Sequence, residues 1–273
     1  MTERNKRQSF LGMNSDRVIG EATVAIVGLC GGGSHVAQQS AHVGFRKFRL
    51  FDPDHVEIPN LNRMVGSTPG DAKTKRSKTH VIRDLILRIR PDAEVELFTN
   101  PWQVSHYALR ESTLVYGCVD SFGQRDELES YCRRFFLPYI DIGMDVHKHS
   151  GREFCITGQV ITSLPGRRCM RCYGFITEAR IAEEAQRYGD SGDRPQVIWP
   201  NGVLASTAVG IGIALTTPWS RQPLVPFVEY DGNRNELRAS SVLSALGDTA
   251  CMHYPVGEAG DPFWSPEAIE ALR

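Results

Sequence analysis

The sequence lacks an excess of charge of either sign, because its 31 Lys and Arg residues are balanced by 32 Asp and Glu residues among 273 positions. Proteins that bind nucleic acid or an anionic membrane through charge usually carry a basic excess. The near-neutral balance therefore argues against both kinds of partner.

A long uninterrupted apolar stretch is also missing. The first ten residues, MTERNKRQSF, are polar and do not resemble a secretory signal. The longest apolar run, Gly202–Leu215, is interrupted by Ser206 and Thr207 and is too short to cross a bilayer as a helix. We therefore expect a cytoplasmic protein that does not enter a membrane.

Cysteines are few and scattered. There are seven, an odd number without the spacing of a disulfide framework, and this favours a reducing compartment. The exception is the pair Cys169 and Cys172, whose CxxC spacing is typical of half a metal site. The alternative is a pair of ordinary thiols in a reduced protein.

The most informative stretch runs from Thr23 to Arg63. It reads as an apolar strand, a glycine-rich turn, a helix and a second apolar strand that ends in acidic residues. This order predicts a nucleotide-binding βαβ unit, in which backbone amides and a helix N-terminus bind phosphates. The residues that carry the pattern are Gly28, Gly31, Gly32, Gly33, Asp52 and Asp54. Many mononucleotide and dinucleotide binders, including dehydrogenases, share it.

The segment after the second strand, DPDHVEIPNLNR, is too rich in Pro, Asn and Asp for regular structure. It is expected to be a loop at the carboxyl end of that strand, where ligands bind in such sheets. Asp54, Asn60, Asn62 and Arg63 are therefore candidates for nucleotide contacts. The alternative is that these residues only form turns.

Two further features could serve a phosphate site. A helix is predicted over Lys73–Ile89, and the cations at its start, among them Lys78, oppose the helix dipole unless a polyphosphate or plain solvation favours them. Asp120 follows the apolar strand Leu114–Cys118, so its carboxylate could hold Mg²⁺ or, together with Ser121, cap the next helix.

The first half of the chain alternates strands and helices, which indicates a mostly parallel sheet. The second half adds strands that read as antiparallel. The segments expected to be regular are a short helix at Asp16–Ile19, strands at Glu94–Phe98, Pro138–Ile142, Glu153–Ser163, Leu224–Tyr230 and Glu236–Ser241, and helices at Gln124–Phe136, Gly202–Leu215 and Pro266–Leu272. The fold class is therefore α/β, with a Rossmann-like, mostly parallel sheet and antiparallel C-terminal strands.

Five motifs in order now support a family resemblance: GLCGGGS, FDPDHVEIPNLNR, DAKTKRSK, CVDS and CMRC. Together they resemble the ThiF/MoeB/HesA family, the ubiquitin-activating-enzyme-like adenylyltransferases. The resemblance extends over about Arg7–Val209, and its most specific part is the form DxDxVxxxNLNR.

The resemblance implies a role for each motif. Gly28, Gly31, Gly32 and Gly33 would shape the loop for the ATP phosphates, with Asp52 and Asp54 at the ribose, Asn60, Arg63 and Lys78 at the phosphates and Asp120 on Mg²⁺. Arg7 resembles an arginine finger that reaches the ATP of a partner subunit, so a homodimer is expected. Two positions depart from the family pattern, Cys30 in the glycine loop and Ser121 in place of Asn, and neither removes a charged participant.

The resemblance also divides the chain. It implies an N-terminal arm of residues 1–21 with the arginine finger, an ATP-binding adenylyltransferase domain of residues 22–245 and a C-terminal tail of residues 246–273. Family members often complete their zinc site with a second CxxC near the C-terminus. Here Cys251 and His253 stand at that place, and Tyr254 occupies the fourth cysteine position, so a structural Zn²⁺ held by Cys169, Cys172, Cys251 and His253 is expected.

The implied reaction is attack of a carboxylate on the α-phosphorus of ATP, giving an acyl-adenylate and pyrophosphate. The implied substrate is the C-terminal carboxylate of a small ubiquitin-like (β-grasp) or sulfur-carrier protein ending in Gly-Gly. Alternatives are a peptide, small-molecule or tRNA-linked carboxylate, or an inactive scaffold that binds a ubiquitin-like protein. Some relatives carry a catalytic cysteine in the stretch that corresponds to Ile176–Pro200, which has none here, so adenylation without an obligatory enzyme thioester is expected.

Overall fold

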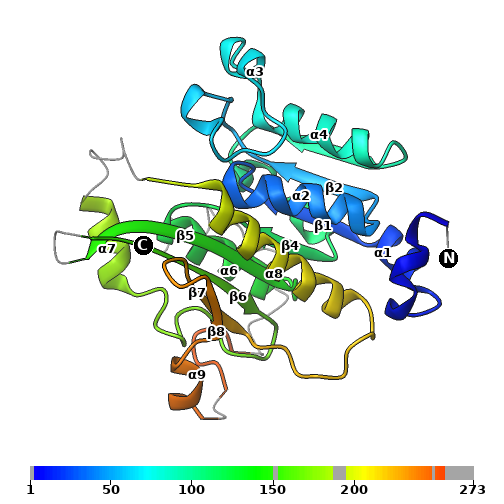
Figure 1. Cartoon of the computed structure of the whole chain (residues 1–273). Coiled ribbons are helices and arrows are strands. Elements are labelled where there is room, and N and C mark those ends of the chain that lie inside the picture. The colour runs from blue at the N-terminus through cyan, green and yellow to red at the C-terminus, as the bar shows by residue number, and fades with distance from the viewer. Residues whose placement is uncertain (1–2, 150–152, 187–194, 248–249, 256–273) are drawn as a thin grey trace.

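A computed structural model describes residues 3–149, 153–186, 195–247 and 250–255, and within them the strands form one eight-stranded sheet (Figure 1). The strands are β1 (Thr23–Val27), β2 (Lys47–Phe51), β3 (Glu94–Phe98), β4 (Leu114–Gly117), β5 (Tyr139–His149), β6 (Glu153–Ser163), β7 (Phe227–Asp231) and β8 (Glu236–Ala239). Their order is β3-β2-β1-β4-β5-β6-β7-β8.

The sheet has a parallel half and an antiparallel half. Strands β1 to β5 pair in parallel, whereas β6, β7 and β8 are added in antiparallel pairs. The α/β fold with antiparallel C-terminal strands, expected from the sequence, is confirmed. Because β1 lies between β2 and β4, the chain reverses its direction of addition there, and ligands bind at such a switch point in open sheets.

Helices cover both faces of the sheet. The helices are α1 (Ser15–Glu21), α2 (Gly31–Val43), α3 (Pro69–Lys73), α4 (Lys78–Ile89), α5 (Tyr107–Arg110), α6 (Phe122–Arg134), α7 (Glu178–Gln186), α8 (Ile198–Thr216) and α9 (Val242–Ala245). Short 3₁₀ turns lie at Glu3–Leu11, Ile58–Asn60 and Trp102–Ser105.

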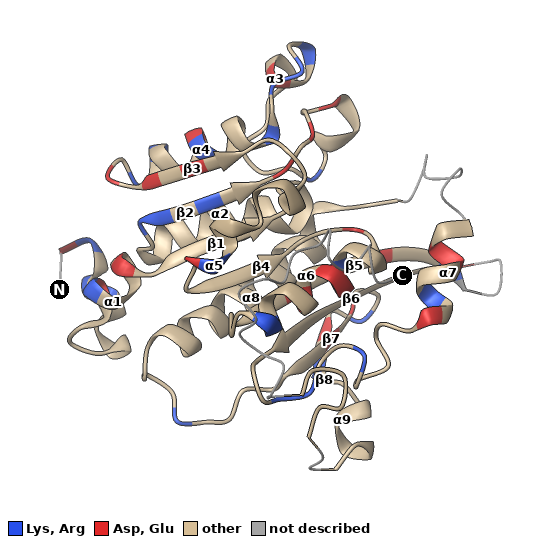
Figure 2. Ribbon diagram, turned by 180° about the vertical axis from the view of Figure 1, so that it is seen from behind, with Lys and Arg blue, Asp and Glu red and all other residues tan. Residues whose placement is uncertain are grey.

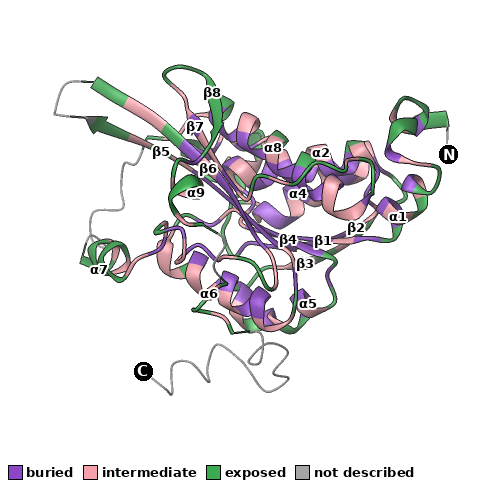
Figure 3. Cartoon of the chain, turned by 90° about the horizontal axis from the view of Figure 1, so that it is seen from below, coloured by how far each residue is buried: buried purple, intermediate pink, exposed green. Residues whose placement is uncertain are grey.

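Two apolar cores result from the alternation of side chains along the central strands. In β1, Val24 and Ile26 face the core under α2, α4 and α8, whereas Ala25 and Val27 face the core under α5 and α6. Both cores are fully enclosed at β1 and β4, while the far end of the β5–β6 hairpin and α7 are exposed (Figure 3). The parallel half is therefore the rigid part that can position a site.

Helix α8 is longer than the sequence suggested. It spans 19 residues with a mean hydropathy of 1.5, enough by length and composition to cross a membrane, but half of it is buried inside the molecule. It packs against α2 and against β5 and β6 as a core helix. Charged residues of both signs are scattered over the ribbon (Figure 2).

The prediction of one helix over Lys73–Ile89 is wrong for its first turn. The chain instead forms the short α3, whose N-cap Thr68 and Asp71 exchange hydrogen bonds, and then turns through Lys75 with φ +47° before α4 begins at Lys78. Helix α3 ends at Lys73 because the chain turns through Lys75 in a left-handed conformation, so the apolar periodicity starts only with α4. The strand expected at Pro138–Ile142 runs on to His149, because it pairs along its length with β6.

The helix expected at Pro266–Leu272 lies outside the described residues, as does most of the predicted tail of residues 246–273. The sequence DSGDRPQVIWP also predicts a loop at Asp190–Pro200, and residues 190–194 of it lie outside the described residues. Its last three residues, Ile198–Pro200, form the first turn of α8 rather than loop.

Candidate nucleotide cleft and metal cluster

A cleft of about 950 Å³ lies at the carboxyl ends of β1, β2, β4 and β5. The sequence candidates among its lining residues are Gly28, Gly31, Gly32, Asp52, Asp54, Asn60, Arg63, Lys78 and Asp120. These come from five separate stretches of the chain, and the sheet topology brings their strand ends to one edge. The cleft has the size and the mixed polarity of a site for a small-molecule ligand.

The glycine loop joins β1 to α2 and requires glycine for steric reasons. Gly28 has φ +87°, and a Cβ there would lie 2.5 Å from the carbonyl oxygen of Cys118. Gly33 does not line the cleft, but a Cβ on it would lie 1.8 Å from the carbonyl oxygen of Gly28. The loop is therefore tightly folded, and α2 begins at Gly31 with its N-terminus at the cleft.

Asp52 supports the glycine loop from β2. Its two carboxylate oxygens accept hydrogen bonds from the backbone N–H of Leu29 (2.7 Å) and of Asp54 (2.9 Å). The residue is only 5% exposed, and burial raises its pKa even though Lys78 opposes the shift. The Asp54 side chain is 65% exposed, so it is the carboxylate of this pair that a ligand can reach.

Lys78 places a buried cation at the first residue of α4. Its Nζ lies 2.8 Å from Oδ2 of Asp54 and 3.9 Å from Oδ1 of Asp52. Burial lowers the pKa of Lys78, but the two carboxylates outweigh that effect and the net pKa is raised. The ammonium group is thus protonated and fixed beside the glycine loop, where it can meet a phosphate group.

The loop after β2 forms a 3₁₀ turn that holds the next two candidates. Asn60 is 8% exposed, and its Oδ1 accepts a hydrogen bond from the N–H of Glu57 (2.9 Å). Arg63 donates from Nη1 to the carbonyl oxygen of Pro59 (2.6 Å) and to Oδ1 of Asn62 (3.1 Å). Both residues line the cleft, whereas Asn62 does not.

Asp120 is exposed at the end of β4 and lines the cleft. It does not cap α6, because Ser121 is the N-cap and its Oγ accepts a hydrogen bond from the N–H of Gln124 (3.1 Å). The carboxylate therefore remains available at the cleft, and an oxygen ligand of this kind suits Mg²⁺.

Arg125 is the main cleft residue that the sequence did not indicate. It is 7% exposed and forms a buried ion pair with Asp141 of β5, which itself accepts a hydrogen bond from the hydroxyl of Tyr139 (2.9 Å). Its Nη2 also donates to the carbonyl oxygens of Val119 (2.5 Å) and Ile142 (3.3 Å). Arg125 thereby ties the ends of β4 and β5 to α6.

Other lining residues were also missed. They include Trp102, Gln103, Gln124, Gln196 and Asn201. None belongs to a spacing pattern that marks a ligand site, and only the folded chain brings them beside the glycine loop. The sequence signal that could have pointed to Arg125 is its place on the helix after Asp120.

Arg7 does not join the cleft. It is exposed on the 3₁₀ arm Glu3–Leu11, which lies beside α1 at the end of the molecule where β1 begins (Figure 1). The cleft lies at the other ends of the strands. Within one chain, the structure therefore keeps Arg7 apart from the other predicted residues.

A second site is formed by Cys169, Cys172, Cys251 and His253. One ligand atom from each lies within 4.8 Å of the others. The Sγ–Sγ distances are 3.6 Å for Cys169–Cys172 and 3.6 Å for Cys172–Cys251, and Nδ1 of His253 lies 3.5 and 3.3 Å from the first two sulfurs. Tetrahedral zinc with its usual bond lengths would separate two sulfurs by about 3.8 Å and a sulfur from a nitrogen by about 3.6 Å. The residues therefore fit zinc.

Helix α6 connects this cluster to the cleft. Arg171, between the two cysteines of the CxxC, donates from Nε and Nη2 to the two carboxylate oxygens of Asp126 on α6, both at 2.7 Å. One turn later, the buried Glu129 accepts a hydrogen bond from the N–H of Met170 (3.0 Å). The C-terminal part of α6 is thus held at the cluster while its N-terminus follows Asp120.

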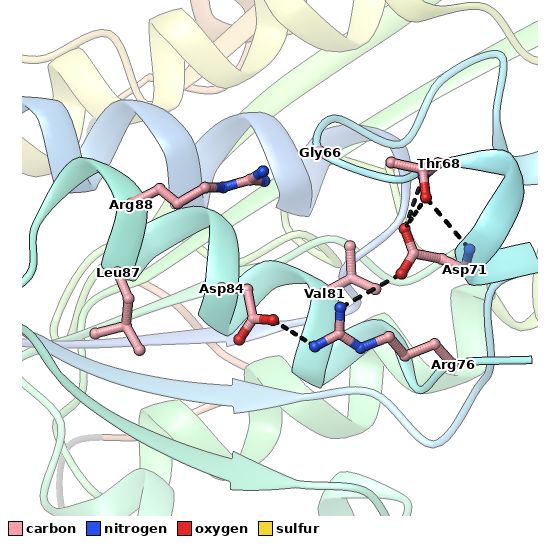
Figure 4. A pocket seen from close by; sticks show the side chains of 8 residues that line it. All are labelled: Gly66, Thr68, Asp71, Arg76, Val81, Asp84, Leu87 and Arg88. Carbon is pink, nitrogen blue, oxygen red and sulfur yellow. Dashed lines mark hydrogen bonds and ion pairs between the residues drawn. The ribbon is translucent and has the colours of Figure 1, made fainter. Parts of the chain in front are cut away.

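A shallower pocket of about 530 Å³ lies between α3 and α4 (Figure 4). Arg76 sits between Asp71 and Asp84 there and forms ion pairs with both. Because this cation is already neutralised within the protein, the pocket is a weaker candidate for a ligand site than the cleft at the strand ends.

The sequence profile of the ThiF family matches residues 2–246. Ubiquitin-like modifier-activating enzyme 5 of Caenorhabditis elegans is 29% identical over 186 residues, which cover 63% of this chain and 42% of that protein. Protein HesA of Leptolyngbya boryana is 29% identical over 180 residues, covering 62% of this chain and 60% of HesA.

Among solved structures, Escherichia coli MccB is similar. Its complex with AMPCPP and MccA aligns with a TM-score of 0.72 and 20% identity, covering 88% of this chain and 71% of that chain. At that identity the likeness concerns the fold. The present chain spans about two fifths of the length of the modifier-activating enzyme.

Proposed function

The chain belongs to the ThiF family, and from that premise we propose that it is an ATP-dependent adenylyltransferase acting on the C-terminal carboxylate of a ubiquitin-like or sulfur-carrier protein. The observation that carries the proposal is Lys78, a buried cation fixed against Asp52 and Asp54 beside the glycine loop. A fixed cation, a phosphate loop and a carboxylate for Mg²⁺ at one switch point are what adenylation needs.

In the proposed reaction, the carboxylate of the substrate attacks the α-phosphorus of ATP. The bond from that phosphorus to the bridging oxygen breaks, and pyrophosphate carries the electron pair away. The nucleophile is already anionic, so no general base is required. Lys78 and Arg63 would stabilise the charge that grows on the phosphoryl oxygens, and the N–H groups at the start of α2 would bind the phosphates.

Two metal ions belong to the proposal. Mg²⁺, held by Asp120, would neutralise charge on the triphosphate, and the exposed carboxylate in the cleft supports this assignment. Zn²⁺ would be held by Cys169, Cys172, Cys251 and His253. Four protein ligands leave no open coordination position, so that zinc would be structural.

A homodimer is also proposed. Arg7 lies on an arm away from its own cleft, so it could serve a cleft only in another copy of the chain. An exposed aromatic pair near this arm supports an interface, with Phe10 and Trp219 in edge-to-face contact at 5.7 Å between ring centroids. We place the protein in the cytoplasm, since none of the seven cysteines, all of which lie in the described residues, forms a disulfide.

A peptide carboxylate is the second candidate substrate. It is favoured by the likeness to MccB, which was solved together with AMPCPP and MccA. In either case we propose that the adenylate is discharged without a thioester on this chain, because residues 176–200 contain no cysteine.

The test is ATP–pyrophosphate exchange with candidate carrier proteins that end in Gly-Gly, with and without Mg²⁺. The wild type is compared with Asp120→Ala and with the control Asp145→Ala, which removes an exposed carboxylate outside the cleft. We expect exchange that depends on carrier, Mg²⁺ and Asp120. Tight ATP binding without exchange for any carrier would move the assignment to peptide or small-molecule carboxylates, and absence of ATP binding would overturn the enzymatic proposal.

A further inference from the structure

The first turn of α8 packs directly against the glycine loop. A Cβ built on Gly31 would lie 2.7 to 2.9 Å from Nδ2, Cγ and Oδ1 of Asn201, and one on Gly32 would lie 3.7 Å from Oδ1 of Asn201. The next residue of α8 continues the contact, because a Cβ on Gly202 would lie 3.4 Å from Cε1 of His35 on α2. The Asn201 amide therefore lies against the two peptide units that begin α2.

Asn201 is buried but faces the cleft. It is 5% exposed and belongs to the cleft lining. Its Nδ2 donates to the carbonyl oxygen of Val197 (2.9 Å), and in the described part of the chain this is the hydrogen bond that its side chain makes. An amide carries two N–H donors and an acceptor, so Asn201 keeps hydrogen-bonding capacity at the wall of the cleft.

We propose that Asn201 is a further phosphate-binding residue, whose side-chain N–H contacts the phosphate groups that the glycine loop holds. The proposal rests on the proposed function in so far as the cleft binds a nucleotide. A buried donor with unmet capacity gains free energy when an anionic oxygen reaches it, because hydrogen bonds to charged groups are the stronger ones.

Asn201 also ends a segment, residues 196–201, that contacts two loops of the cleft. The carbonyl oxygen of Gln196 accepts a hydrogen bond from Nδ2 of Asn62 (3.1 Å), next to Arg63. Residues 196–201 are thus held at one end by the loop of Arg63 and at the other by the glycine loop. A nucleotide bound through both loops would fix the start of α8 in place.

The experiment measures dissociation constants for Mg–ATP and for adenosine by calorimetry, with wild type, Asn201→Ala and Asn201→Asp. Both variants lose the hydrogen bond to Val197, so their difference reports the added carboxylate group, and the comparison with adenosine isolates its effect on the phosphates. A carboxylate next to phosphate oxygens repels them, so Asn201→Asp should bind ATP at least about tenfold more weakly than Asn201→Ala. Adenosine carries no phosphate, and its affinity should differ by less than about twofold between the two variants.

Ser206→Ala is the matched control, because Oγ of Ser206 makes the same kind of bond within α8, to Gly202 (2.8 Å), and lies outside the cleft. We expect wild-type affinity for both ligands. Equal ATP affinity of Asn201→Asp and Asn201→Ala would overturn the proposal and leave the proposed function standing, as would equal losses for ATP and adenosine. If the wild type binds no ATP, the proposed function fails first, and the role of Asn201 fails with it.

A second measurement tests the contact by shape rather than by charge. Gly31→Ala alone should lower ATP affinity, because the new methyl group would strike Asn201. In the Asn201→Gly background the methyl group has room, so Gly31→Ala should have at most about a third of its effect on the dissociation constant. Equal effects in both backgrounds would mean that the Asn201 side chain does not lie against the glycine loop, which removes the contact on which the proposal rests and would overturn it.

Discussion

The nucleotide cleft and the cysteine–histidine cluster differ in how their polar groups are satisfied. In the cleft, Lys78 forms an ion pair with the exposed carboxylate of Asp54. Arg63 donates hydrogen bonds to a backbone oxygen and to an amide oxygen. In the cluster, four ligand atoms already surround one point within 4.8 Å. The cations of the cleft can thus take up a ligand in place of these partners, whereas the cluster can hold one ion with four protein ligands.

From this difference we expect the two halves of the sheet to have separate roles. Residues of the parallel half should control binding and catalysis, and the cluster beside the antiparallel half should control stability. Helix α6 is the physical connection between them, through the pair Asp126–Arg171. Variants in the cleft, in the cluster and on α6 test whether the two sites are separate in this way.

The largest effect is expected at the cluster. Cys172→Ser removes one of four ligands and should lower the free energy of unfolding by more than about 4 kcal/mol, because losing a structural metal is among the few single changes of that size. Metal content and the melting temperature should fall together, while the ATP affinity of the folded fraction stays near that of wild type. Cys155→Ser, outside the cluster, is the control, and an unchanged zinc content in Cys172→Ser would refute the assignment.

Next comes the buried pair between α6 and β5. Arg125→Met leaves Asp141, which is fully buried, without its cation, and should cost about 3–5 kcal/mol of stability. The double variant Arg125→Met/Asp141→Leu removes both charges and should recover most of the melting temperature. We expect its ATP affinity to remain low, because Val119, next to Asp120, has lost the guanidinium that holds its carbonyl oxygen. Recovery of both properties would show that Arg125 serves stability alone.

The third change isolates catalysis. Lys78→Met should slow ATP–pyrophosphate exchange by about 10²–10³-fold, the loss typical of a preorganised group that stabilises transition-state charge. Zinc content should not change. Lys73→Met, which removes an exposed cation outside the cleft, is the control and should keep wild-type exchange. A loss of zinc in Lys78→Met would contradict the separation of the two sites.

The smallest effect is expected at α3, apart from both sites (Figure 4). Burial raises the pKa of Asp71, but hydrogen bonds from Thr68 and Arg76 outweigh it, so the net pKa is lowered. A lowered pKa adds stability above the unfolded-state pKa of about 4, and this stability is lost as the pH falls through the folded-state pKa.

Thr68→Ala should therefore cost about 1 kcal/mol at pH 7, and the difference from wild type should shrink below about pH 4. Denaturant unfolding at several pH values measures it. Thr74→Ala, which removes a hydroxyl bonded only to the backbone at the other end of α3, should show a smaller difference without this pH dependence. If Thr68→Ala lowers the free energy of unfolding by the same amount at every pH, the hydrogen bonds from Thr68 do not lower the pKa of Asp71.

Much of the nucleotide site could be predicted because its signals are local. Strand β1, the glycine loop, α2 and β2 follow each other within one stretch, so hydrophobic periodicity and glycine spacing identify them. The CxxC half of the Cys₃His set could be predicted from its spacing, whereas Cys251 and His253 were expected only from the family resemblance. The start of α4 could not be predicted, because Lys75 takes a left-handed conformation that interrupts the range assigned to one helix, and no residue pattern marks that turn.

Residue types at short spacings were enough to predict the fold class, the glycine loop and most of the candidate residues of both sites. Only the tertiary structure decided that Arg125 and Asn201 line the same cleft as Lys78, and that Arg7 does not. Such neighbours are set by strand order and helix packing between distant segments, such as those of Gly31 and Asn201, and no local pattern encodes those contacts.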